Sequence, residues 1–96
     1  MALTFRRDYP IMLGPDLGVI ADIACVELAL IITVEDDVAL KRMSPAELEH
    51  EAIAKAALED AEWLMLNLWY RDVMERMDGC LIQIDRAIMR AREAFE

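Results

Sequence analysis

The stretch from Leu17 to Val34 is 18 residues long and strongly apolar, and it limits the possible folds more than any other feature. A helix of this length and composition could span a bilayer. However, the stretch contains Asp22 and Glu27, and an acidic residue near the bilayer centre costs about 2.5–3.5 kcal/mol on insertion scales. The sequence therefore predicts a buried helix of a soluble protein, with no membrane partner.

The content of hydrophobic residues indicates self-association. The 96 residues form one domain, and 57% of them are hydrophobic. Ordinary globular domains have roughly 45–50%, even when glycine is counted as apolar. A short chain buries a modest core, so we expect the surplus to be covered in a homo-oligomer, most simply a dimer of helical hairpins.

The expected fold class is all-α: a helical bundle built on an antiparallel helical hairpin plus a C-terminal helix. An N-terminal arm over 1–14 precedes a single helical domain over 15–96, with helices at about 15–43, 45–78 and 79–95. Gly14 and Pro15 give a helix start signal. Leu28 to Val34 is rich in Ile and Val and could be a strand, but the length of the run favours a helix. Residues 2–6 could form a short strand, although no partner strand is evident.

The boundaries of the second and third helices rest on local signals. Ser44, Pro45 and Glu47 form the pattern of a capping box and predict a helix start. Gly79 could end that helix, yet the spacing of apolar residues runs unbroken from Val73 to Phe95. One helix continuous through Gly79 is therefore an open alternative.

Six residues are candidates for contact with a ligand or partner: Glu27, Trp63, Asn67, Tyr70, Met65 and Trp69. In a helix, Glu27 would lie on the most apolar face. That placement predicts a carboxyl group with a raised pKa, acting as an acid, a base or an anchor for a cationic group. A structural hydrogen bond to Trp63 or Asn67 is the alternative.

Acidic residues dominate the charge, which is −9 over the whole chain. Nine of them lie between residues 35 and 62: Glu35, Asp36, Asp37, Glu47, Glu49, Glu51, Glu59, Asp60 and Glu62. We expect them around one end of the helical hairpin, either as a solvated tip or as a surface that docks a basic protein partner. Direct binding to nucleic acid is not expected, because it needs clustered positive charge.

Metal and cofactor chemistry find little support. Glu47 and His50 have the i,i+3 spacing of carboxylate-bridged di-iron bundles, but the chain has one such motif where those sites need two. A solvated acidic helix start is the alternative. Cys25 and Cys80 are interpreted as small buried residues. No phosphate-binding loop or catalytic set is present, and no cofactor is expected.

The leading functional hypothesis is a cytoplasmic, non-enzymatic homo-oligomer that acts by occupying a partner, as an inhibitor or adaptor. A bacterial or phage inhibitor of a host complex, carried by a mobile element, is one concrete version. The first alternative is a small-molecule-binding protein or small enzyme with a pocket between subunits. A metal-carboxylate oligomer using Glu47 and His50 is the second alternative.

Overall fold

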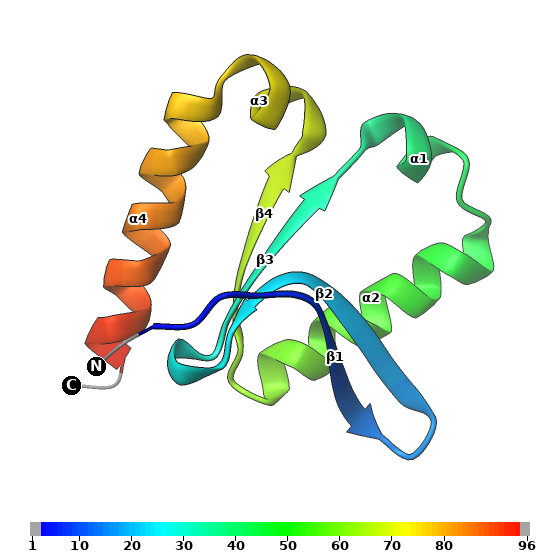
Figure 1. The fold of residues 1–96 in the computed structure, drawn as a ribbon. Coiled ribbons are helices and arrows are strands. Elements are labelled where there is room, and N and C mark those ends of the chain that lie inside the picture. The colour runs from blue at the N-terminus through cyan, green and yellow to red at the C-terminus, as the bar shows by residue number, and fades with distance from the viewer. Residues whose placement is uncertain (1–2, 95–96) are drawn as a thin grey trace.

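The computed structural model describes residues 3–94, which form a mixed α/β fold (Figure 1). Its centre is a four-stranded sheet of order β1-β2-β3-β4. The strands are β1 (Arg6–Gly14), β2 (Leu17–Cys25), β3 (Leu30–Glu35) and β4 (Leu64–Trp69). The helices are η1 (Val26–Leu28, a 3-10 turn), α1 (Asp37–Lys41), α2 (Pro45–Asp60), α3 (Tyr70–Glu75) and α4 (Met77–Ala94).

The prediction of an all-α bundle is wrong, and the error begins at Pro15. This residue and Asp16 form the tight turn of a β-hairpin, so β1 and β2 pair antiparallel from Arg6–Ala24 to Gly14–Leu17. The fixed φ of proline suits the second position of a β-turn as well as the first turn of a helix. The segment expected as an arm thus supplies β1, while residues 1–2 lie outside the described part of the chain.

The apolar run is folded in two rather than helical. It forms β2, reverses through η1 and Ala29, and returns as β3. Ala29 has a left-handed backbone (φ 49°) that helps to turn the chain. The β-branched residues from Ile31 to Val34 favour a strand over a helix, and β3 pairs antiparallel with β2 from Ile23–Ile32 to Cys25–Leu30.

The second helix begins as predicted but ends 18 residues earlier, at Asp60 rather than about residue 78. The capping box is confirmed: the Glu47 amide donates to Ser44 Oγ (3.2 Å), and the Ser44 amide donates to Glu47 Oε1 (3.3 Å). After Glu62, which has a φ of 65°, the chain forms β4. This strand runs parallel to β3, in register from Leu30–Leu64 to Glu35–Trp69.

The segment around residues 63–70 is apolar on two sides. The reason is that it forms a strand with a hydrophobic core packed on each face. Leu64, Leu66 and Leu68 belong to the core under α4. Trp63 and Met65 pack against the core under α2. An alternating pattern with both faces apolar is typical of a strand between two helical layers.

The last helix starts at Met77 rather than at about Gly79. The helical backbone breaks at Arg76 (φ −137°, ψ 49°), which separates α3 from α4. Helix α4 then runs through Gly79 without interruption. The predicted stop at Gly79 is wrong, and the alternative of a continuous helix holds only from Met77 onward. Phe95, the last residue of the predicted stripe, lies outside the described residues.

Two cores lie on the two faces of the sheet. Helix α4 packs against η1, β3 and β4, and α2 packs against β1 and β2. The core under α4 consists of Cys25, Leu28, Leu30, Ile32, Leu68, Cys80, Ala87 and Ala91. The core under α2 consists of Ile11, Ala21, Ala24, Ile31 and Leu58. Cys25 and Cys80 are buried free cysteines, as interpreted from the sequence.

The molecule is flat, with extents of 40 × 37 × 19 Å and a radius of gyration of 14.0 Å. A compact domain of this length has a radius of gyration of roughly 12.5 Å. In Figure 1, helices α4 and α2 stand apart on either side of the strands. Within residues 3–94, no helix combines the length and apolarity needed to cross a membrane.

Candidate binding site

The parallel strands β3 and β4 end side by side at Glu35 and Trp69. Beyond this edge the chain leaves in two directions, into α1 and into α3 (Figure 1). Ligands of open α/β sheets bind outside the carboxyl ends of parallel strands, where the following segments diverge. We call this region the carboxyl-end site.

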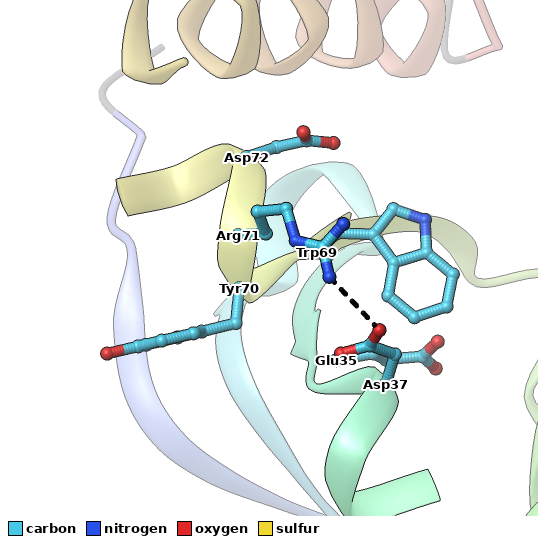
Figure 2. Close-up of a pocket in the computed structure, with 6 residues that line it drawn as sticks. All are labelled: Glu35, Asp37, Trp69, Tyr70, Arg71 and Asp72. Carbon is cyan, nitrogen blue, oxygen red and sulfur yellow. Dashed lines mark hydrogen bonds and ion pairs between the residues drawn. The ribbon is translucent and has the colours of Figure 1, made fainter. Parts of the chain in front are cut away.

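Two hollows meet at the carboxyl-end site. The first, of about 260 Å³, is lined by Glu35, Asp37, Trp69, Tyr70, Arg71 and Asp72 (Figure 2). The second is a groove of about 490 Å³ between α2 and the β2–β3 part of the sheet. Its polar lining residues are Asp22, Thr33, Glu35, His50, Glu51 and Lys55. Glu35 belongs to both hollows and so joins them.

Two ion pairs cross between elements at this site. Lys55 Nζ on α2 lies 3.0 Å from Glu35 Oε1 at the end of β3. One guanidinium nitrogen of Arg71 lies 3.4 Å from Asp37 Oδ2, which links α3 to α1 (Figure 2). The Arg71–Asp37 pair is exposed and the Lys55–Glu35 pair is partly buried; an exposed pair contributes about 0–1 kcal/mol to stability. Their main effect here is to hold charged groups at the mouth of the site.

The groove opens because β2 and β3 separate at this end. Their pairing stops at Ile23–Ile32. Beyond that point the Val34 amide donates to Asp22 Oδ2 (2.9 Å) instead of to a strand partner. The Thr33 hydroxyl donates to the side-chain oxygen of Asn67 on the neighbouring strand. The Asp22 carboxylate thus satisfies the Val34 amide in place of a strand partner, and a groove remains between the strands and α2.

Aromatic surface is exposed next to these charges. Trp69 is 47% exposed and Tyr70 is 52% exposed. In Figure 2 the indole of Trp69 lies beside Glu35 and Asp37, whereas the ring of Tyr70 points away from them. Trp, Tyr and Arg are the residues most enriched at binding hot spots, and here they are consecutive, from Trp69 to Arg71. Carboxylates beside an indole face suit a basic side chain, through ion pairing and cation–π contact.

The structure brings together only some of the residues singled out from the sequence. Asn67, Trp69 and Tyr70 lie at the carboxyl-end site, and Met65 lines the groove. Trp63 precedes β4, and Glu27 lies in η1 before β3, so both are at the opposite end of these strands. A single site containing Glu27, Trp63 and Asn67 is therefore not formed within the chain.

Glu27 does not have the raised pKa expected for a carboxyl group on an apolar helix face. It lies in a partly exposed turn, where its own backbone amide and the Cys25 thiol donate to the carboxylate and lower its pKa. The Cys25 Sγ–Glu27 Oε2 distance is 3.4 Å. Burial, with a smaller contribution from Glu27, raises the pKa of the Cys25 thiol. A role for Glu27 in partner contact stays a prediction.

The nine acidic residues are spread from the end of β3 through α1 and α2 to the turn before β4, rather than gathered at a hairpin tip. Glu35 and Asp37 form the ion pairs described above, and Asp36 accepts from the Val38 amide at the start of α1. Glu47 is held by the capping box, while His50 lines the groove. Among residues 3–94, no three His, Cys, Asp or Glu side chains gather closely enough to hold a metal ion.

Several residues of the site were not singled out from the sequence. Lys55, Arg71, Asp22 and Thr33 carried no motif, and Glu35 and Asp37 stood only as members of an acidic run. The sequence signal that could have indicated this site is the consecutive run Trp69-Tyr70-Arg71, which directly follows an apolar segment.

Comparisons with protein-family models, curated proteins and solved structures find no significant match.

Proposed function

We propose that this protein is a non-enzymatic interaction protein that self-associates and binds a partner with a basic surface at the carboxyl-end site. It acts by occupying that partner, as an inhibitor or adaptor does. Two properties of the molecule support the proposal: the size of its exposed surface and the composition of the carboxyl-end site.

The exposed surface is the observation on which the self-association rests. The accessible area of the chain is 7052 Å². A compact monomer of 11.0 kDa is expected to expose about 5,600 Å², so the excess is about 1,400 Å². A stable interface buries about 800 Å² per partner. Exposed large apolar side chains on several elements, such as Met12, Ile20 and Met74, contribute to this area.

The charge of the site supports a basic partner. The chain carries a net charge of −9, and most of the ionised groups around the two hollows are carboxylates. Complementary charge accelerates encounter and selects partners, while a desolvated aromatic anchor supplies most of the affinity. Trp69 is suited to be that anchor.

A titration with a basic peptide tests the site. We expect an arginine-rich peptide to shift the NMR signal of the Trp69 indole N–H. Glu35→Gln combined with Asp37→Asn should weaken binding by about tenfold, since two carboxylates that face the peptide are removed. Affinity is measured by calorimetry at physiological salt.

The matched control removes the same charge far from the site. Glu59→Gln combined with Asp60→Asn neutralises two exposed carboxylates at the end of α2. This variant should bind the peptide within twofold of the unmodified protein. Equal weakening by both pairs would mean that the peptide responds to overall charge, and the proposed site would be rejected.

A second candidate function is small-molecule binding in the groove between α2 and the sheet. Its volume of about 490 Å³ falls within the roughly 300–1,000 Å³ of ligand pockets. Carboxylates, His50 and Lys55 face the same groove. Native mass spectrometry of gently purified protein distinguishes the two functions. A reproducible extra mass that is lost in Lys55→Met would favour the small-molecule function, and a bare polypeptide mass would favour the interaction protein.

A further inference from the structure

The outer edge of β4 is unpaired in the part of the chain that the structure describes. Strand order β1-β2-β3-β4 leaves β1 and β4 as the two edges of the sheet. An edge strand presents a row of free backbone N–H and C=O groups, to which another strand can add. Most proteins protect such edges with charged residues, proline or bulges.

The two edges differ sharply in protection. On β1, Arg6 and Arg7 are charged, and Pro10 lacks a backbone N–H. Asp8 has a φ of 48° and is left out of the pairing between Arg7 and Tyr9, and the register with β2 shifts between Met12 and Gly14. On β4, the sequence LMLNLW has no charge, proline or glycine. Its register with β3 is unbroken over all six pairs. The edge of β4 therefore retains the features that permit strand addition.

A basic stripe on α4 borders this open edge. Gln83, Arg86 and Arg90 line a groove of about 250 Å³ together with residues 64–66 of β4. Their spacing places them on one side of the helix. The chain from α3 to the start of α4 has the opposite sign, by a smaller margin: Asp72, Glu75 and Asp78 stand against Arg71 and Arg76. Along α4 itself, the charge changes from negative in the first half, with Asp78 and Asp85, to positive in the second half, where arginines outnumber Glu93.

We infer that a second copy of this chain pairs with the outer edge of β4, antiparallel and about a two-fold axis, which makes one sheet continuous across the dimer. The inference rests on the self-association in the proposed function and assigns the surface that carries it. Arg90 lies near Leu64 at the start of β4. Antiparallel pairing therefore brings the basic end of each α4 toward the acidic start of the other.

The available area is sufficient for such a dimer. A standard interface removes about 800 Å² from each partner, less than the excess of about 1,400 Å² estimated above. An isologous interface is self-complementary, so each charged contact occurs twice.

Charge-reversal variants test this arrangement. Arg86→Glu with Arg90→Glu should weaken self-association at least about tenfold, because like charges meet at both symmetric contacts. Glu75→Arg with Asp78→Arg should weaken it similarly. An equimolar mixture of the two variants should form a heterodimer about as stable as the original homodimer, since both contacts are again between opposite charges. This rescue also shows that both variants are folded.

The control carries the same change in charge elsewhere. Lys41→Glu with Arg42→Glu alters two exposed residues at the end of α1 and should leave association unchanged. Hydrogen exchange gives an independent measurement. The Leu64 amide donates to the Ala29 carbonyl on the β3 side, so the alternate amides of Met65, Asn67 and Trp69 face the outer edge. These three amides should be protected in the dimer and exchange faster on dilution.

The outcomes separate this inference from the proposed function. If the protein associates but the amides of β4 stay unprotected and the mixture gives no heterodimer, the interface is elsewhere, and self-association stands. If the protein is a monomer at all concentrations, both the proposed self-association and the β4 interface are wrong. A monomer whose β4 amides become protected only when an acidic peptide is added would show that the edge binds another protein and would overturn the assignment to a second copy.

Discussion

Replacing Leu30 with Ala is expected to lower the free energy of unfolding by about 2–5 kcal/mol, the range for large-to-small changes in a packed core. Leu30 is fully buried in β3, within the core under α4. Its removal leaves a cavity bordered by strands and a helix that cannot easily collapse. For a domain of this size, each kcal/mol corresponds to about 4–8 °C in melting temperature.

Urea denaturation followed by circular dichroism measures this loss. Val34→Ala is the matched control, because Val34 lies on the same strand and is 37% exposed. The control should lose less than half as much stability as Leu30→Ala. Equal losses at the two positions would contradict the placement of Leu30 in the interior of the sheet.

Leu58→Asp is expected to cost about 3–5 kcal/mol or to detach α2 from the sheet, since an unpaired carboxylate would be buried there. Leu58 is 5% exposed and is the α2 residue in the core beneath that helix. Ile53→Asp, on the same helix at a 52% exposed position, should cost under about 1 kcal/mol. Fluorescence-detected urea denaturation at neutral pH compares the two variants.

The effect of pH on Leu58→Asp gives a second check with a defined sign. Burial raises the folded-state pKa of the introduced carboxyl group above its unfolded value of about 3.9. The penalty is therefore absent below pH of about 3.9 and grows as the pH rises through the folded pKa. Relative to the unmodified protein, the variant should regain stability on acidification. A constant deficit across this range would argue against burial of the position.

Two predictions that depend only on neighbouring residues were correct. The capping box at Ser44 and Glu47 depends on four neighbouring residues, and the structure contains it. Likewise, apolar surroundings were enough to place Cys25 and Cys80 in the interior.

The fold class was not recoverable by the same reasoning. A strand buried on both faces gives a continuous apolar run that periodicity does not distinguish from a buried helix. The residues that decide between a helix and strands are therefore those in the turns: Pro15 and Asp16, Ala29, and Glu62. Of these, only Pro15 carried a clear signal, and that signal suits a helix start as well as a turn.

The candidate site was predicted in part, for a related reason. Trp69, Tyr70 and Asn67 stood out because of their residue types. The contacts of Glu35 with Lys55 and of Asp37 with Arg71 join residues 20 and 34 positions apart. Such pairs depend on how α2, α3 and the sheet are packed, which no local pattern specifies.

Strand β4 connects the two proposals. Its outer edge carries the inferred dimer interface, and its last residue, Trp69, belongs to the carboxyl-end site. Pairing through β4 would therefore place two copies of the site on one rigid assembly. Two linked sites bind a partner with repeated basic segments more tightly than one site, without any additional kind of contact.

Sedimentation velocity from low to high micromolar concentration tests most directly whether the apolar surface that one chain leaves exposed is covered by association. The account predicts a concentration-dependent species of twice the 11.0 kDa of a single chain. A single monomeric species across the whole range would contradict it.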